Sequence, residues 1–250
     1  MTDFTELFNL KGKKIIVTGG AQGIGHEFVK AFKQAGAEIV VLDISDKVAS
    51  FSSLNVGYIK CDLMEVEKIK LYFKQALELL DGKLDVLINC AGIIKRSPAV
   101  DVPLETWQKI FNLNVLSLFE LSRLAAVEMK KFGQGKIINL SSIVSIVGAY
   151  NSSPYSASKG AVLQLTKSLS NEWAQYGIQV NAIAPGYILT DMNSDILQDP
   201  VRKKEFEDRI PSKKWGDPQD IVGTAMFLAT KASDYVTGIL IPVDGGVLSR

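Results

Sequence analysis

The chain has 250 residues, of which 47% are hydrophobic and 22% are charged, so it can bury a large core and has no signature of disorder. Its 28 basic and 27 acidic residues give a formal net charge of +1, which offers no support for a nucleic-acid or membrane partner. The N-terminus carries acids where a secretory signal needs positive charge, and no apolar run is expected to be long enough to span a bilayer. These features predict a soluble, cytoplasmic protein.

Metal and disulfide chemistry find little support in the composition. The two cysteines, Cys61 and Cys90, lie in apolar surroundings, and we expect both to be reduced core residues. His26 is the single histidine, which leaves no Ser-His-Asp arrangement and no histidine-based metal cluster. We therefore predict no metal site.

Short apolar, β-branched runs alternate along the chain with longer segments of helical period. These runs are nearly continuously apolar, which is typical of parallel strands covered on both faces. The alternation predicts an α/β fold in one domain over residues 1–250, a Rossmann-type doubly wound parallel sheet of about seven strands with helices on both faces. The predicted strands are 14–18, 38–42, 56–60, 84–89, 135–141, 178–184 and 238–243.

One irregular, charge-rich stretch, residues 190–215, lies after a predicted strand and before a predicted helix. The start of that helix is indicated by Asp217 at its N-cap, Pro218 at its first position and Asp220 in its first turn. A long insertion at this place predicts a lid or substrate loop within the same domain.

A glycine-rich segment, TGGAQGIG (18–25), directly follows the first predicted strand and opens the first helix. Glycines at positions 19, 23 and 25 let the backbone turn sharply and approach a pyrophosphate, whose charge the helix N-terminus stabilises. The spacing differs from the commonest dinucleotide fingerprint, and a tight turn without a ligand is the alternative. The position between a strand and a helix favours the dinucleotide site.

An acidic residue, Asp43, ends the second predicted strand, 18 residues beyond Gly25. A carboxylate at this distance accepts hydrogen bonds from the adenosine ribose hydroxyls and repels a 2′-phosphate, and the next basic residue is Lys47. We therefore predict NAD rather than NADP as the cofactor, with a turn-capping aspartate as the alternative. Asp62, after the third strand, is either a partner for the adenine or another turn cap.

Candidate catalytic residues lie around the segment YSASK (155–159), in which Tyr155 and Lys159 share one helix face. A lysine cation stabilises phenolate, so the pair can act as a tunable proton donor and acceptor, although such pairs also occur on helix surfaces. Ser142 follows a strand at the edge where a substrate carbonyl or alcohol could be held. Asn114, in an apolar helical run, is either a core amide or a residue that bends the helix and holds a water for proton relay.

Together with NCAG (89–92) and PGYILT (185–190), these motifs resemble those of the short-chain dehydrogenase/reductase family over essentially the whole chain. The family usually has NNAG, so Cys90 departs from its pattern, and we expect cofactor binding to survive the change. The resemblance implies hydride transfer between NAD and a secondary alcohol carbon or its ketone. The cofactor residues that it implies are Gly19, Gln22, Gly23, Ile24, Gly25, Asp43, Asp62, Leu63, Asn89, Ala91, Gly92, Tyr155, Lys159, Pro185, Gly186, Ile188 and Thr190.

The resemblance also implies roles for the catalytic residues. Tyr155 is the general acid/base, and Ser142 positions the substrate carbonyl. Lys159 binds the nicotinamide ribose and lowers the pKa of Tyr155, and Asn114 takes part in the proton relay. It further implies a homotetramer, with long helices such as 102–131 and 155–175 at the interface.

The substrate is indicated by Lys95 and Arg96, which follow NCAG at the expected mouth of the site. Segments such as DRIPSKKWGDP (208–218) resemble the gluconate 5-dehydrogenase and 2-deoxy-gluconate or 2-keto-3-deoxy-gluconate dehydrogenase subgroup. An arginine is the natural bidentate partner of a carboxylate, so we expect Arg96, with Lys95 or Arg209 nearby, to bind a sugar acid that reaches Ser142 and Tyr155. A solvated charge pair is the alternative interpretation of Lys95 and Arg96.

Three other functions remain open on the sequence. A 3-oxoacyl-thioester reductase shares the motifs but normally uses NADPH, against which Asp43 argues. A dehydrogenase of neutral polyols or sugars is a second alternative. A catalytically inactive NAD-binding sensor or scaffold is the third, and the intact Ser142, Tyr155 and Lys159 argue against it.

Overall fold

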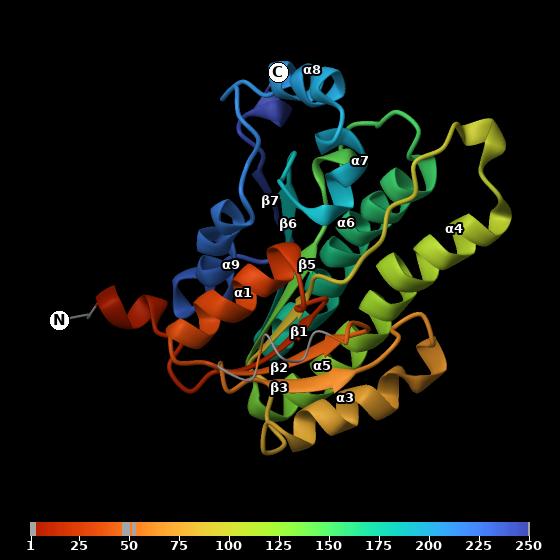
Figure 1. Cartoon of the computed structure of the whole chain (residues 1–250). Helices are drawn as coiled ribbons and strands as arrows, with labels where there is room; N and C mark the ends of the chain where they lie inside the picture. Colours follow the sequence, from red (N-terminus) through yellow and green to blue (C-terminus); the bar gives the residue numbers. More distant parts are fainter. Residues whose placement is uncertain (1–3, 47–50, 52–53, 250) are drawn as a thin grey trace.

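The computed structural model describes residues 4–46, 51 and 54–249. Seven parallel strands form one sheet in the order β3-β2-β1-β4-β5-β6-β7 (Figure 1). All seven predicted strands are present, with ends that differ from prediction by at most two residues, so the predicted fold class is confirmed. The strands are β1 (Lys14–Thr18), β2 (Glu38–Asp43), β3 (Gly57–Lys60), β4 (Val86–Asn89), β5 (Gly135–Leu140), β6 (Ile178–Pro185) and β7 (Leu240–Val243).

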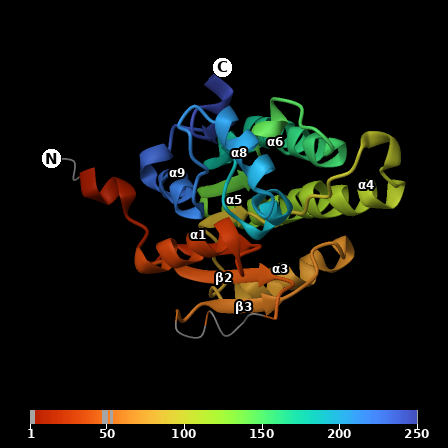
Figure 2. The ribbon, with the colours of Figure 1, turned by 45° about the horizontal axis from the view of Figure 1, so that its top comes forward.

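Helices cover both faces of the sheet (Figures 1 and 2). Alternate residues of β1 point to opposite faces: Ile15 and Val17 pack in the core with α1 and α9, and Ile16 packs in the core with α3 and α5. Two covered faces explain why the strands are apolar without alternation. The helices are α1 (Gly23–Gln34), α3 (Ile69–Glu78), α4 (Leu104–Phe111), α5 (Leu118–Phe132), α6 (Ser153–Trp173), α7 (Ser194–Leu197), α8 (Pro200–Arg209) and α9 (Val222–Ala229).

The direction of the strand order changes at β1, which lies between β2 and β4. A sheet of this kind opens a crevice at the carboxyl ends of its strands at that point. The Thr18 hydroxyl, at the end of β1, accepts hydrogen bonds from the N–H groups of Cys90 and Ala91, both at 3.0 Å. The NCAG segment is thereby fixed beside the glycine-rich loop.

Helices α4 and α5 are joined by a π-helix, Asn112–Ser117, which contains Asn114. A π-helix widens the turn, so the helix departs from α-geometry where the sequence predicts a bend at Asn114. The combined segment Leu104–Phe132 has an 18-residue window with a mean hydropathy of 1.4, enough to cross a membrane by length and composition, contrary to the sequence-based expectation. Half of that window is buried inside the protein, as in a core helix.

The charge-rich segment after β6 is more regular than predicted. It contains α7 and α8, and the side chain of Asp199 accepts hydrogen bonds from the N–H groups of Val201 and Arg202 at 3.0 and 3.2 Å. With Pro200 at the first helical position, this is an N-terminal signal that the sequence analysis missed. The next helical turn begins as predicted: the Asp217 N–H donates to the Asp220 carboxylate at 2.9 Å.

At the amino-terminal ends of the strands, a buried carboxylate, Asp85, links β1 to β4. It accepts a hydrogen bond from the Lys14 N–H at 3.0 Å and lies 3.4 and 3.1 Å from the Lys13 and Lys83 ammonium groups. Burial by itself would raise the pKa of Asp85, but the Lys14 N–H and the two lysines outweigh it and hold the pKa below its usual value of 3.8. The folded state therefore favours the ionised carboxylate.

We expect Asp85→Asn to lower the free energy of unfolding by about 2 kcal/mol at neutral pH, because it removes a buried charge with hydrogen-bonded partners. Since the folded pKa is depressed, this stabilisation is present above pH 3.8 and is lost as the pH falls through the lower folded value. The free energies of unfolding of the wild type and the variant, measured by urea unfolding, should therefore become equal at acidic pH. Glu38→Gln is the control, because Glu38 is half exposed beside Lys14 and its ion pair contributes little to stability. A difference in the free energy of unfolding between the wild type and Asp85→Asn that stays the same at every pH would contradict the role of the Asp85 charge.

Candidate active site

Two adjoining cavities open at the carboxyl edge of the sheet. We call the one lined by Ser142, Tyr155 and Lys159, of about 290 Å³, the tyrosine cavity. The other, of about 350 Å³, is lined by the glycine-rich loop and Asp43, and we call it the glycine-loop cavity. The two are continuous, because five residues line both: Ile24, Cys90, Gly92, Thr190 and Met192.

The glycine-rich loop is shaped by backbone contacts that side chains would prevent. Gly19 has a φ of +66°, and a Cβ at this position would lie 2.8 Å from the Cα of Ala91. A Cβ at Gly25 would lie 2.2 Å from the Gly19 carbonyl oxygen. The start of α1 therefore lies directly against the loop, and its N-terminus faces the cavity as a site for a phosphate group requires.

Asp43 is buried beside the same loop and lines the glycine-loop cavity. One carboxylate oxygen accepts a hydrogen bond from the Ala21 N–H and the other from the Ser45 N–H, both at 2.9 Å. These bonds hold the carboxylate in one orientation and leave each oxygen with further acceptor capacity. Lys47, the nearest basic residue in the sequence, lies outside the described residues.

Most of the predicted cofactor residues come together in these cavities. Asp62 lines the glycine-loop cavity, where a partner for the adenine is expected, and it also caps a turn by accepting a hydrogen bond from the Met64 N–H at 2.9 Å. Those that line the glycine-loop cavity are Gly19, Gln22, Gly23, Ile24, Gly25, Asp43, Asp62, Leu63, Ala91, Gly92 and Thr190. Those that line the tyrosine cavity are Tyr155, Lys159, Pro185, Gly186 and Ile188, together with Ile24, Gly92 and Thr190 again.

Asn89 is the exception, since it lines neither cavity. Its side chain is buried and donates hydrogen bonds to the Ser122 hydroxyl at 3.0 Å and to the Asn139 side-chain oxygen at 2.9 Å. The predicted contact of Asn89 with the adenosine therefore finds no support in the lining of either cavity and stays a prediction. It is the last residue of β4, and its side chain points into the helix-covered interior between β4, β5 and α5.

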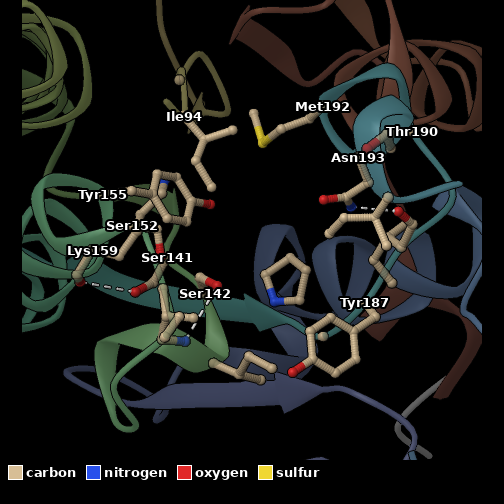
Figure 3. Close-up of a pocket in the computed structure, with 18 of the residues that line it drawn as sticks. Ile94, Ser141, Ser142, Ser152, Tyr155, Lys159, Tyr187, Thr190, Met192 and Asn193 are labelled. Atoms are coloured by element: carbon tan, nitrogen blue, oxygen red, sulfur yellow. Dashed lines mark hydrogen bonds between the residues drawn. The ribbon is translucent and has the colours of Figure 1, made fainter. Parts of the chain in front are cut away.

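Tyr155, Lys159 and Ser142 lie on one side of the tyrosine cavity, opposite Met192, Asn193 and Tyr187 (Figure 3). The Lys159 ammonium donates to the Leu140 carbonyl at 2.6 Å and lies 5.7 Å from the centre of the Tyr155 ring. Burial lowers the pKa of Lys159 to about 8. The lysine is therefore held by the end of β5, on the same helix face as the tyrosine.

Burial raises the pKa of Tyr155 to about 12, and the Ser142 hydroxyl and the positive charge of Arg96 act in the opposite direction. Ser142 and Arg96 are the groups that favour the phenolate here, and the expected effect of Lys159 on this pKa stays a prediction. The phenol is thus protonated at neutral pH and can donate a proton to an oxygen in the cavity.

Asn114 is buried, and both of its amide hydrogens are used. It donates to the Ile93 carbonyl and to the Ser158 hydroxyl, both at 3.0 Å, and its oxygen accepts from the Ile93 N–H at 2.9 Å. A Cβ at Gly92 would lie 3.2 Å from this oxygen and 3.7 Å from the Lys159 ammonium. The glycine therefore leaves space between Asn114 and Lys159, and a relay water there would be held by an acceptor atom of Asn114.

The three predicted substrate cations have different positions. Lys95 is exposed and lines neither cavity, so the structure removes it from the candidate set. Arg96 lines the tyrosine cavity and donates hydrogen bonds to residues 192–195 on its far side. Arg209 also lines this cavity, with its guanidinium 5.1 Å from the Phe206 ring centre.

Comparison with known proteins places this geometry in a family. The family model described as "Enoyl-(Acyl carrier protein) reductase" matches residues 19–248. The 2-dehydro-3-deoxy-D-gluconate 5-dehydrogenase of Bacillus subtilis (strain 168) is 46% identical, over 98% of this chain and 98% of that protein. The chain belongs to the short-chain dehydrogenase/reductase family. It is an oxidoreductase of the dehydrogenase type, as the motifs predict.

Solved structures of the family share the fold over nearly the whole chain. A putative NAD(P)-dependent gluconate 5-dehydrogenase from Beutenbergia cavernae, with bound NADP, has a TM-score of 0.94 and 35% identity, covering 98% of this chain and 100% of that one. A gluconate 5-dehydrogenase from Burkholderia cenocepacia J2315, in complex with NADP and tartrate, has a TM-score of 0.93 and 33% identity, covering 98% of both chains.

Several groups of this short-chain dehydrogenase site could not be identified from sequence motifs. The Leu140 carbonyl holds Lys159, and the Ser141 hydroxyl donates to the Lys159 carbonyl at 3.1 Å. Asn193 lines the tyrosine cavity and donates to the Ile188 carbonyl at 2.8 Å. The Leu140 carbonyl belongs to the backbone, so no residue type in the sequence points to it. Asn193 could have been predicted, because it is a short polar residue just after PGYILT.

Proposed function

We propose that the chain is an NAD-dependent dehydrogenase that interconverts a secondary alcohol and a ketone on a sugar acid of the gluconate or keto-deoxy-gluconate type. The observation that carries the proposal is that one cavity is lined by both the Tyr155 phenol and the Arg96 guanidinium. It therefore offers a proton donor for the carbonyl and a cation for the carboxylate. The names of the relatives support the same substrate class.

The glycine-loop cavity fits a dinucleotide in its shape and its charge. Gly19 and Gly25 leave room for close approach of a pyrophosphate, and Asp43 offers a fixed carboxylate to ribose hydroxyls. When bound, the nicotinamide accepts the hydride from the alcohol carbon or supplies it to the ketone. Gly92, Thr190 and Met192, which line both cavities, are where the cofactor and substrate regions meet.

The chain's own groups handle the proton. In ketone reduction the Tyr155 hydroxyl donates its proton to the forming alkoxide, and in alcohol oxidation the phenolate takes the proton back. Ser142 beside it holds the substrate oxygen and, together with Arg96, favours the phenolate. Lys159, fixed on the Leu140 carbonyl, holds its ammonium 5.7 Å from the centre of the Tyr155 ring and close to Gly92, which lines both cavities.

Asp43 supports NAD as the preferred cofactor, although the solved relatives carry NADP. We expect Asp43→Asn to shift the ratio of kcat/KM for NAD over kcat/KM for NADP by about 100-fold toward NADP, because a carboxylate opposite a 2′-phosphate costs several kcal/mol. Steady-state rates with each cofactor measure the ratio. Asp62→Asn, in the same cavity, is the control and should leave it nearly unchanged; an unaltered ratio in the Asp43 variant would contradict this role.

The substrate class is tested by NADH formation with D-gluconate and with D-sorbitol, which replaces the carboxylate by a neutral alcohol. We expect oxidation of the acid at a kcat/KM at least about 10-fold above that of the polyol, since a charge-assisted pair is lost with the polyol. A preference for D-sorbitol would support the neutral-polyol alternative. Reduction of acetoacetyl-coenzyme A with NADPH, but of no sugar acid, would support the thioester-reductase alternative.

We further propose that residues 1–250 act as one domain and assemble as a cytoplasmic homotetramer. Leu116, Phe119 and Val127, in the π-helix and α5, are 47%, 36% and 53% exposed, and apolar residues gathered on one long helix favour an interface. Sedimentation velocity of the purified protein tests the assembly, and a monomer would contradict it.

A further inference from the structure

Arg96 lines the tyrosine cavity and binds the segment that contains Met192 and Asn193, two residues that lie across this cavity from Tyr155 (Figure 3). Its guanidinium donates to the Met192 carbonyl at 3.1 Å, to the Asn193 side-chain oxygen at 2.7 Å and to the Asp195 carboxylate at 2.8 Å. Nη1 makes two of these bonds and Nη2 makes one, so within the described part of the chain the Nε–H and one Nη2–H remain. These two donors lie on neighbouring nitrogens, and such a pair can bind a carboxylate in a bidentate manner. Arg96 can therefore bind the 192–195 segment and a substrate carboxylate at once.

The segment that Arg96 holds shares a small core with the residues on either side of it. Ile196, Ile210 and Trp215 are buried together, with Tyr187 and Phe206 packed against them, in a cluster separate from the two main cores. We call residues 191–209, with α7 and α8, the lid; both helices lie beyond the carboxyl ends of β6 and β7 (Figures 1 and 2). Because this small core is separate from the two main cores, the lid can open locally without disrupting either of them.

Asp195 lines neither cavity, whereas Asn193 and Ile196 line the tyrosine cavity. One of its oxygens binds Arg96, and the other lies 4.0 Å from the Arg202 guanidinium. Its negative charge is thus shared between two arginines. The positive charge of Arg96 also acts to lower the pKa of Tyr155, which lines the same cavity.

We propose that Asp195 is a positioning residue that acts through Arg96: in the closed lid it holds the guanidinium so that the two remaining N–H donors face the substrate carboxylate. The proposal rests on the proposed function, because it takes the ligand to be a sugar acid. Lid closure and carboxylate binding then reinforce each other, since both need Arg96 in the same place. Asp195 never touches the substrate, yet it tunes selectivity for an acid over its uncharged analogue.

The kinetic test compares the sugar acid that the wild type oxidises faster, D-gluconate or 2-dehydro-3-deoxy-D-gluconate, with its primary amide. We expect Asp195→Ala to raise KM for the acid about fivefold while kcat changes less than about twofold, as for loss of an exposed ion pair. KM for the amide should stay unchanged, and Asp195→Glu should restore much of the affinity for the acid. An unchanged or lower KM for the acid would overturn the proposal, the lower value indicating that Asp195 competes with the substrate.

Two comparisons separate positioning from simple weakening of the lid. Asp199→Ala removes the cap of α8 without touching Arg96, so it should affect the acid and the amide alike. In an Arg96→Ala background, Asp195→Ala should have no further effect on KM for the acid. An effect of full size in that background would show that Asp195 does not act through Arg96 and would overturn the proposal.

Hydrogen exchange of the lid supplies a readout that needs no turnover. With NAD present, D-gluconate should slow amide exchange in residues 191–209 of the wild type and much less in Asp195→Ala. If the wild type oxidises no sugar acid, the proposed function fails. If it does, and the lid is protected equally in both proteins, the function stands and the role of Asp195 is wrong.

Discussion

Tyr155→Phe should lower kcat by about 10³-fold or more in both reaction directions, while the Kd for NAD changes less than about twofold. The substitution removes one hydroxyl from a ring that Lys159 and Ser142 flank, so the cavity keeps its shape and loses its proton donor. The fall belongs to the chemical step, because Tyr155 is the group proposed to exchange a proton with the substrate oxygen, whereas Ser142 holds that oxygen in place. Steady-state NADH formation gives kcat, and titration of NAD by calorimetry gives Kd.

The matched control is Tyr150→Phe. Tyr150 also lines the tyrosine cavity but is 92% exposed at its rim, so the same chemical change should leave kcat within about twofold of the wild type. Retention of a substantial kcat in Tyr155→Phe would contradict the assignment of the general acid/base. Equal losses in the two tyrosine variants would mean that the loss comes from the cavity surface rather than from proton transfer.

Gly25→Ala should weaken NAD binding by about 100-fold. The added Cβ would lie 2.2 Å from the Gly19 carbonyl oxygen, which is backbone and cannot rotate away, so α1 and the glycine-rich loop must separate. Overpacking of this kind costs about 1–3 kcal/mol, and here the displaced atoms are those that approach the pyrophosphate. Equilibrium titration with NAD measures the loss, and circular dichroism checks that the fold is retained.

Gly223→Ala is the control for this variant. Gly223 lies in α9, and nothing approaches within 4 Å of a Cβ built there. We expect NAD binding to be unchanged and the helix to gain up to about 1 kcal/mol from the better helix former. Normal NAD affinity in Gly25→Ala would contradict the close approach of cofactor and loop.

The sheet could be predicted because its strands are buried on both faces. Runs such as 14–18 and 178–184 are apolar enough to be found without any alternation, and the short connections allow few topologies. The helices of the lid were harder to predict, because most residues of α8 are polar and its helical signal is local: Asp199 at the N-cap followed by Pro200.

Most of the candidate site could be predicted from motif spacing, since Tyr155 and Lys159 are neighbours on one helix and the glycine-rich loop is contiguous in sequence. The side-chain direction of Asn89 could not be predicted, because the last residue of a strand can face the cavity or the interior, and only its bonds to Ser122 and Asn139 decide which. The pKa of Tyr155 depends on burial by several elements, which no local pattern reports. The partners of Arg96 lie almost a hundred residues away along the chain.

The most direct measurement is NADH formation by the purified protein with NAD and, in turn, 2-dehydro-3-deoxy-D-gluconate and D-gluconate, with the ketone product quantified in the same samples. We predict turnover of one of these acids, one NADH for each new ketone, and neither product with Tyr155→Phe. Tight binding of NAD without oxidation of either acid, in either reaction direction, would contradict the proposal that this cavity is the active site of a sugar-acid dehydrogenase.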